Sequence, residues 1–418
     1  MGKPNIRFKG YTEDWEQRKL GDFGKATGGT SIESEFSEDG IYKVISIGSY
    51  SENSVYNDQG IRAIKSDKTS NRVLNRNDLT MILNDKTTSG NIIGRVLLIE
   101  ESGIYVYNQR TERIEINLDE YDPVFLYEML NAPNIREKII KQAQGNTQIY
   151  VNWTAISLLE YMIPSKEEQV KIGEYLHSIS NLITLHQRKY DETKKLKKCM
   201  LQKMFPKEGE KVPEIRFSGF TGDWKQRKLG EIVNRITRKN SKLISELPLT
   251  ISAQQGLIDQ NEFFDKRVAS KDVSGYYLIK NGEFAYNKST SNDAPWGAIK
   301  RLDRYENGVL STLYIVFEIK DETLVNSDFL VAYYSTNLWY KGIHEIAAEG
   351  ARNHGLLNIA PTDFFKTKLK LPADIEEQQE IGEYFKKIDS LITFHQQKCD
   401  ELKNIKKFML QNMFVSEK

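Results

Sequence analysis

Two short polar segments in each half of the chain carry side chains suited to reading a DNA duplex. Asn, Gln, Arg and Lys match the donor–acceptor patterns of base edges in the major groove, and Thr and Ser contact bases or phosphates. The candidates in the first half are Lys86, Thr87, Thr88, Ser89, Asn146, Thr147, Gln148 and Tyr150. The candidates in the second half are Lys288, Ser289, Thr290, Asn292, Arg352, Asn353 and His354. For any one residue a solvated loop is the simpler interpretation, but equivalent placement in both halves favours the loops as sets.

Catalytic patterns are weak by comparison. The five histidines lack metal-ligand spacing, and Cys199 and Cys399 have no Cys or His neighbour in the sequence. Asp22–Gly24 imitates a kinase metal motif without the rest of that motif set. Asp293–Trp296 lacks the first proline of the amino-methyltransferase pattern, and Glu318–Lys320 is only the E-x-K half of a nuclease site. The sequence therefore predicts no catalysis and no metal or cofactor bound by this chain.

Composition limits the class of protein. A length of 418 residues suits two or more domains, and no apolar stretch is long enough to cross a membrane. Two cysteines and a polar N-terminal segment favour a reducing cytoplasm. The net charge of +1 argues against DNA binding by charge alone, although residues 165–206 carry nine Lys and Arg against five Asp and Glu.

The chain is one unit written twice. PNIRFKGYTEDWEQRKLGD at residues 4–22 recurs at 213–231 as PEIRFSGFTGDWKQRKLGE, and the 39-residue segment 167–205 recurs at 376–414. Both recurrences have the same offset, 209 positions. The stretches between them, roughly 25–160 and 234–370, have little obvious identity. This pattern is typical of two modules that do one kind of task on different targets, although duplication followed by neutral drift is the simpler alternative.

The repeated 39-residue segments predict long helices of about 58 Å each. Ser165 and Glu168, like Asp374 and Glu377, have the spacing of a capping box. Apolar residues recur at 4-3-4-3 spacing, which predicts packing of the coiled-coil type, with each helix the simplest partner of the other. The seam positions are Ile172, Leu176, Ile179, Ile183, His186, Ile381, Phe385, Ile388, Ile392 and His395.

The regions between the repeated segments predict two α+β domains. Alternating apolar runs predict strands at residues 42–47, 79–83, 92–99, 104–107 and 113–116, and at 249–252, 283–286 and 310–319. Helices are predicted near 123–130, 135–144, 328–337 and 340–348. We therefore predict an α+β domain at 1–164, a long helix at 165–206, a second α+β domain at 207–372 and a second long helix at 373–418.

The whole chain resembles the specificity subunit of a type I restriction–modification system. The marks of the resemblance are the D-W-x-Q-R-K-L-G openings (Asp14–Gly21 and Asp223–Gly230), the E-E-Q-x-x-I-G-E-Y helix starts and the duplicated order. It implies two target-recognition domains that each read one half of a split DNA sequence. It also implies helices that space these domains and dock the modification (methyltransferase) subunits, two of them expected. S-adenosylmethionine chemistry would belong to those subunits, and ATP- and Mg-dependent translocation and cleavage to the restriction subunits.

Two structural expectations follow, and one alternative stays open. An approximate two-fold axis requires an antiparallel helix pair, which would bring His186 and His395 together either as polar residues at a crossing or as a pair that fixes register. Because the two domains differ in sequence, the DNA target should not be palindromic. The alternative is a coiled-coil adaptor protein whose α+β domains bind peptides or carbohydrates instead of DNA.

Overall fold

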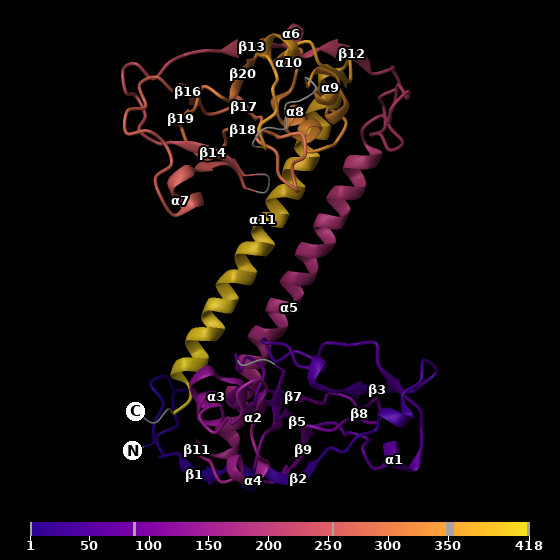
Figure 1. The fold of residues 1–418 in the computed structure, drawn as a ribbon, viewed down its shortest axis with the longest axis vertical. Coiled ribbons are helices and arrows are strands. Elements are labelled where there is room, and N and C mark those ends of the chain that lie inside the picture. Colours follow the sequence, from indigo (N-terminus) through magenta and orange to yellow (C-terminus); the bar gives the residue numbers. More distant parts are fainter. Residues whose placement is uncertain (1, 87–88, 253–254, 348–354, 416–418) are drawn as a thin grey trace. The chain divides into compact units, whose positions relative to one another are not determined.

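The computed structural model describes residues 2–86, 89–252, 255–347 and 355–415, which form two compact units. The first unit contains residues 1–187 and 396–418, and the second contains residues 188–395. Figure 1 traces the elements along the chain. Each unit thus combines one of the two α+β domains with part of each long helix.

A four-stranded antiparallel sheet forms the centre of the first unit, in the order β2 (Gly24–Gly28), β9 (Thr111–Ile116), β5 (Leu79–Ile82), β7 (Val96–Leu98). Helices α2 (Pro123–Asn131) and α3 (Pro133–Ile140) follow it in the chain. The smaller elements are β1 (Glu16–Lys19) paired with β11 (Glu160–Ile163), β4 (Arg62–Ala63), β3 (Tyr42–Ile45), β8 (Tyr105–Tyr107), β6 (Asn84–Asp85), β10 (Ile149–Tyr150), α1 (Asp67–Ser70) and α4 (Trp153–Ile156).

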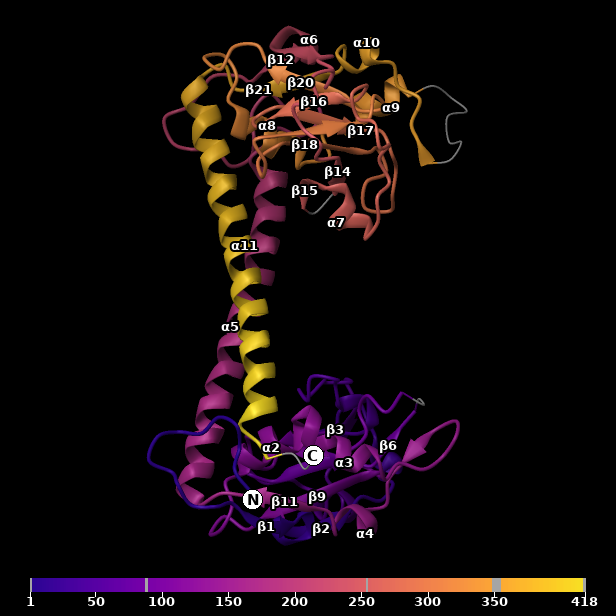
Figure 2. The ribbon, with the colours of Figure 1, turned by 90° about the vertical axis from the view of Figure 1, so that its left-hand side faces the viewer.

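The second unit repeats the central sheet, in the order β13 (Val233–Ile236), β20 (Ile315–Ile319), β17 (Phe284–Asn287), β18 (Ala298–Arg301). Its helices α8 (Ser327–Tyr334) and α9 (Tyr340–Ile346) correspond to α2 and α3 (Figure 2). The smaller elements are β12 (Lys225–Lys228) paired with β21 (Lys368–Leu371), β14 (Leu249–Ser252) with β15 (Gly256–Asp259), β16 (Tyr277–Lys280) with β19 (Asn307–Leu310), and α6 (Leu229–Ile232), α7 (Gln260–Phe264) and α10 (Pro361–Phe364).

Local chemistry accounts for the equivalent helices α2 and α8. Pro123 occupies the first turn of α2, where its missing N–H is not needed, and the Asp122 carboxylate accepts a hydrogen bond from the Phe125 N–H at 2.7 Å. In the second unit the Asn326 side chain accepts from the Phe329 N–H at 2.9 Å. The two repeats therefore use different capping residues to start the same helix.

The predicted strand at residues 310–319 is wrong in one respect. The structure divides it into β19 and β20, because the main chain turns at Ser311–Tyr314, where the Tyr314 N–H donates to the Ser311 carbonyl at 3.1 Å. Strand β14 and helices α2 and α9 lie where the sequence predicts them, within two residues.

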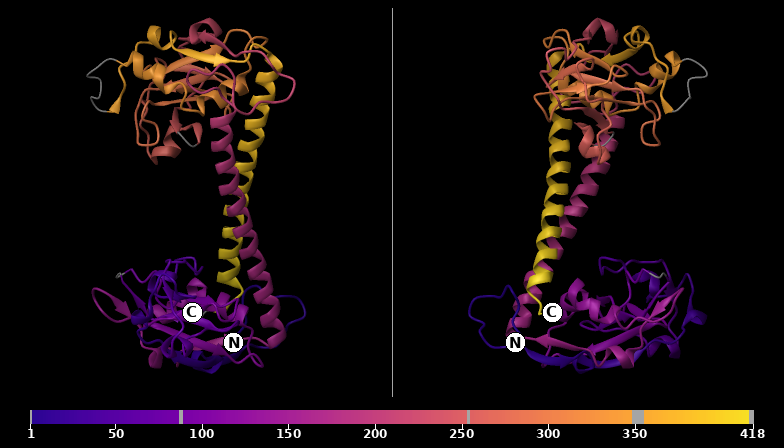
Figure 3. Two further views of the ribbon diagram at one scale, coloured as in Figure 1. Left: turned by 90° about the vertical axis from the view of Figure 1, so that its right-hand side faces the viewer. Right: turned by 60° about the vertical axis from the view of Figure 1, so that its left-hand side comes forward.

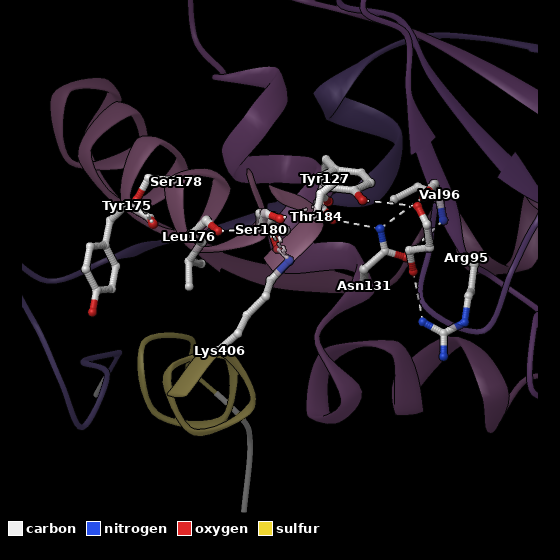
Figure 4. Close-up of polar contacts among 12 residues, drawn as sticks. Arg95, Val96, Tyr127, Asn131, Tyr175, Leu176, Ser178, Ser180, Thr184 and Lys406 are labelled. Atoms are coloured by element: carbon white, nitrogen blue, oxygen red, sulfur yellow. Dashed lines mark hydrogen bonds and ion pairs between the residues drawn. The ribbon is translucent and has the colours of Figure 1, made fainter. Parts of the chain in front are cut away.

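The long helices are α5 (Lys166–Lys203) and α11 (Ile375–Asn412), and they run antiparallel within each unit (Figure 3). In the first unit the Lys406 ammonium donates to the Ser180 hydroxyl at 2.7 Å and bonds the Glu128 carboxylate of α2 at 2.8 Å (Figure 4). In the second unit the equivalent Lys197 pairs with Asp389. A lysine at the same helix position thus finds its carboxylate on α2 in one unit and on the long helix in the other.

The ends of the two helices are exchanged between the repeats. Phe414, from the second repeat, packs on Phe125 in the core of the first unit, with 5.7 Å between ring centroids. Phe205, from the first repeat, packs on Phe329 in the core of the second unit at 5.6 Å. Neither α+β domain therefore has a complete core without the helix end of the other repeat.

Arg7 and Glu168 form the joint between the first α+β domain and α5. The guanidinium makes two hydrogen bonds of 2.7 Å to the Glu168 carboxylate, which is buried. Arg216 and Glu377 repeat this geometry in the second unit, also at 2.7 Å. Each glutamate therefore forms an ion pair with an arginine far away in the sequence. The spacing that suggested a capping box gave no indication of these arginine partners.

Gln169 and Gln378 complete the joint through main-chain atoms. The Gln169 side chain accepts from the Asp122 N–H at 2.9 Å and donates to the Glu120 carbonyl at 3.2 Å. Gln378 makes the same contacts with the Asn326 N–H and the Leu324 carbonyl. Because main-chain atoms are independent of side-chain identity, this joint tolerates divergent domains.

Replacing Gly382 of α11 by Ala is expected to destabilise the second unit by about 1–3 kcal/mol. A Cβ at this position would lie 2.7 Å from the Phe329 nitrogen, so the helix or α8 would have to shift. Gly342→Ala in α9 is the matched control, because its Cβ would meet only Thr367 at 3.5 Å. The unfolding free energy of that variant should rise by up to about 1 kcal/mol, because alanine has a higher helix propensity than glycine. Urea unfolding of both variants checks the prediction, which fails if both substitutions stabilise.

Glu112 of β9 makes the stability of the first unit depend on pH. Burial raises its pKa to about 7, and the nearby Arg72 guanidinium opposes this only partly. The folded state therefore holds a proton that the unfolded chain releases, and the unfolding free energy should fall by about 2–3 kcal/mol as pH rises from about 4.5 to 7. Glu112→Gln should remove this fall, whereas Glu115→Gln, an exposed change on the same strand, should keep it. Urea midpoints at pH 5 and pH 8 measure both; an unchanged pH dependence in Glu112→Gln would refute the assignment.

Candidate DNA-reading loops

The two polar segments of the first unit lie side by side. Strand β6, at the start of the first segment, pairs antiparallel with β10, so that Ile149 faces Asp85 and Tyr150 faces Asn84. The Val151 N–H extends the pairing to the Leu83 carbonyl at 2.9 Å. Segments more than 50 residues apart in sequence thus form one surface, with the second segment projecting as a hairpin (Figure 2).

The tip of this hairpin presents the candidate side chains to solvent. Gln144 and Tyr150 exchange two main-chain hydrogen bonds of 2.9 Å, which close the hairpin. Gly145 takes φ +100°, and a Cβ there would lie 2.2 Å from the Gln148 carbonyl oxygen, so the turn requires glycine. Asn146, Thr147 and Gln148 are consequently exposed at the tip.

Two half-buried arginines hold the base of the first segment. Arg136 of α3 donates to the Gly90 and Ile93 carbonyls at 3.1 and 2.9 Å, and Arg95 donates to the Asn91 carbonyl at 2.9 Å. Burial and the neighbouring Arg95 lower the pKa of Arg136 to about 10. These bonds fix the loop that carries Lys86 and Ser89, both exposed.

In the second unit the first segment pairs with residues 355–357, at the end of the second segment. Ser289 forms an antiparallel bridge with Leu356, and the Thr290 N–H and hydroxyl both donate to the Gly355 carbonyl, at 2.7 and 3.1 Å. The Leu357 N–H donates to the Lys288 carbonyl at 3.0 Å. Burial lowers the pKa of Lys288. Pairing of the two loops is therefore common to both repeats, although their sequences differ.

Five of the candidate residues lie outside the described part of the chain: Thr87, Thr88, Arg352, Asn353 and His354. Lys86, Ser89, Asn146, Thr147, Gln148 and Tyr150 lie on the loop pair of the first unit, and Lys288, Ser289, Thr290 and Asn292 on that of the second. Their individual roles stay predictions.

Sequence reasoning missed a cleft beside the second loop pair. Its volume is about 870 Å³, and its walls come from β14, α7 and the segment 287–294. The polar side chains of Thr250, Ser252, Gln255 and Gln260 line the same cleft as Ser289 and Thr290. The missed residues lie in the divergent stretch 234–370, where comparison of the two repeats gives no sequence signal, and only the fold brings them beside the loop.

The seam residues divide between the two units. Ile172, Leu176 and Ile179 are buried in the first unit, and Ile381, Phe385 and Ile388 in the second. Ile183, His186, Ile392 and His395 are partly exposed. His186 belongs to the first unit and His395 to the second, and their pairing stays a prediction.

Neither a metal-binding cluster nor a membrane-spanning helix is present among the described residues. No group of three or more His, Cys, Asp or Glu side chains in residues 2–86, 89–252, 255–347 and 355–415 is arranged to hold a metal ion. Within the same ranges, no helix combines the length and the apolar character needed to cross a membrane.

The paired loops, the duplicated sheets and the helix joints define a protein with two recognition domains. The family model of the type I restriction modification DNA specificity domain matches residues 12–195 and again residues 221–404. The chain belongs to this family, as the sequence resemblance predicts.

One curated relative and one solved structure are similar to this chain. The type I restriction enzyme MjaVIII specificity subunit of Methanocaldococcus jannaschii is 27% identical over 194 residues, which are 45% of this chain and 45% of the relative. The chain thus aligns with less than half the length of this curated relative. The type I restriction–modification S subunit from M. genitalium has the same fold over 100% of both chains, with a TM-score of 0.65 and 14% identity. The predicted architecture, two tandem α+β domains with two long antiparallel helices, is confirmed.

Proposed function

We propose that this chain is the sequence-specific DNA-binding subunit of a type I restriction–modification complex and has no catalytic activity of its own. The observation that carries the proposal is the pairing of the same two loops in both units. Each pair presents Lys, Asn, Gln, Ser or Thr side chains on a main-chain framework, and these are the residue types that contact base edges and phosphates. Because the loop sequences differ, each unit would read a different half of a split, non-palindromic target.

The long helices would dock the modification subunits. Leu182 of α5 and Leu391 of α11 occupy equivalent positions in the repeat and are 44% and 50% exposed, and Phe394 beside Leu391 is 48% exposed. Large apolar side chains repeated on an exposed face are typical of a protein interface. Two equivalent surfaces would accept two copies of one partner. S-adenosylmethionine would then bind the modification subunits, and ATP and Mg the restriction subunits.

The hairpin tip of the first unit provides the test. Gln148→Ala is expected to weaken binding to the specific duplex by about 1–3 kcal/mol and to relax one base position of one half-site, if its amide contacts a base edge. Asn181→Ala, which removes an exposed amide from α5, should leave binding unchanged. Titration of specific and scrambled duplexes at several salt concentrations, with modification subunits present, measures both.

Two results would contradict the proposal. Equal affinity for specific and scrambled duplexes would favour an adaptor protein that does not read DNA. Methyl transfer from S-adenosylmethionine by the purified chain alone would show that the catalytic activity resides here.

A further inference from the structure

The second unit contains a large basic cavity that the loop pair does not explain. Its volume is about 940 Å³, and it lies between the last turns of α5, strand β18 and the connection from α8 to α9. Six lysines and three carboxylates line it: Lys194, Lys197, Lys198, Lys203, Lys207, Lys300, Glu214, Asp293 and Asp389. The lining therefore has an excess of positive charge.

Three of the six lysines already pair with a carboxylate. Lys203 and Lys207 both pair with Glu214, at 2.6 and 3.4 Å, and Lys197 pairs with Asp389. The Lys300 ammonium of β18 makes no hydrogen bond or ion pair with any residue that the structure describes. Burial and the neighbouring Lys197 ammonium lower its pKa, and the Asp389 carboxylate opposes them only partly.

The first unit shows that the fold does not require a lysine at this position. Lys300 lies opposite Ala285 of β17, and the equivalent residue of β7, opposite Thr80 of β5, is Leu97. Leu97 is 3% exposed and packs in an apolar cluster. A leucine therefore satisfies the scaffold, whereas a partly buried ammonium is costly when the nearby Asp389 carboxylate already pairs with Lys197. An anion in the cavity would offset that cost.

We propose that this cavity binds a phosphate group, with Lys300 as its central contact and Lys194 and Lys198 around it. Lysine ammoniums bind phosphate as flexible point charges, and several of them around one cavity match its multiple negative charge. The phosphate could belong to the DNA backbone or to a free nucleotide. The DNA source rests on the proposed function, and it is supported by Asp293 and Ala294, which line both this cavity and the cleft beside the DNA-reading loop.

The test compares Lys300→Leu with Lys271→Leu in the full chain. Lys300→Leu restores the residue type of the first unit and should fold, and Lys271 is an exposed lysine outside both cavities. Duplex affinity is measured against salt concentration, for specific and scrambled sequences. Thermal unfolding is measured separately with and without inorganic pyrophosphate and no DNA.

Each source of phosphate gives its own result. For the DNA backbone, Lys300→Leu weakens both duplexes about 3- to 10-fold and lowers the salt slope by about one, while the preference for the specific duplex is kept. For a free nucleotide, pyrophosphate stabilises the wild-type chain and Lys271→Leu but not Lys300→Leu, with unchanged duplex binding. Lys300→Arg, which keeps the charge, should retain most of either effect.

The proposal is overturned if Lys300→Leu matches Lys271→Leu in the salt slope and in the pyrophosphate response. Failure of the proposed function looks different, because the wild-type chain would then show no preference for the specific duplex while pyrophosphate could still stabilise it.

Discussion

Exchange of residues 25–160 for the matching segment of another specificity subunit is expected to change one half of the DNA target and leave the other half intact. The segment contains both loops of the first pair, whereas Arg7 and Glu168 of the joint lie outside it. The contacts that Gln169 makes across the joint are to main-chain atoms, which a different sequence still provides. The exchanged protein should bind the original DNA target more weakly by about 4 kcal/mol or more. This is roughly the lower limit of the free-energy difference between specific and non-specific DNA binding.

Sequencing of methylated sites in a host that carries the exchanged gene measures this result. The matched experiment exchanges residues 234–370 and should alter the other half-site only. Both exchanges leave the lengths of α5 and α11 unchanged, so the gap between the half-sites should stay constant. If either exchange alters both half-sites, the two units do not read DNA independently.

Glu377→Gln is expected to destabilise the second unit by about 3–5 kcal/mol, because it leaves the Arg216 guanidinium without its buried counter-charge. The carboxylate is 1% exposed and also accepts a hydrogen bond from the Trp224 indole at 3.2 Å. The hydrogen bond to Glu377 raises the pKa of Arg216, and a guanidinium without that bond still stays charged at neutral pH.

Glu376→Gln is the control, one residue earlier on the exposed face of α11, and should change stability by no more than about 0.5 kcal/mol. Hydrogen exchange in β17 and β20 reports on the second unit separately from the first. An Arg216→Met, Glu377→Leu double variant that is as stable as the wild type would show that the cost comes from the unpaired charge. Equal stability of Glu377→Gln and Glu376→Gln would contradict the prediction.

The sequence predicted the elements that depend on local pattern. The repeated segments 167–205 and 376–414 placed both long helices to within two residues, whereas the predicted bounds 165–206 and 373–418 were too wide. Alternation placed β14 without error. Strand β18 was missed, because its Ala-Ile-Lys-Arg sequence has no clear alternation and the strand exists through pairing with β17. The division between β19 and β20 was missed because the turn between them contains neither glycine nor proline.

The candidate site was predictable only as separate loops. Asn84–Ser89 and Gly145–Tyr150 could be recognised by polar composition and by their counterparts in the second repeat. That they pair through β6 and β10 depends on main-chain hydrogen bonds, which composition does not encode. Thr250 and Lys300 lie in the divergent stretch 234–370, so comparison of the repeats gave no sign of the cleft and the cavity beside them.

By itself, the sequence determined the duplication, the α+β domains, the long helices and the family, because these depend on repeated motifs and on periodicity that a single chain displays. The tertiary structure decided what the repeated motifs are for. Glu168 and Glu377 have the spacing of helix caps, yet they bind arginines 161 positions earlier in the chain. Phe205 and Phe414 follow directly after their own helices, yet each completes the core of the other repeat's domain. The physical reason is that buried charges and aromatic rings are stabilised by whichever partner the fold brings to them, and that partner need not be near in sequence.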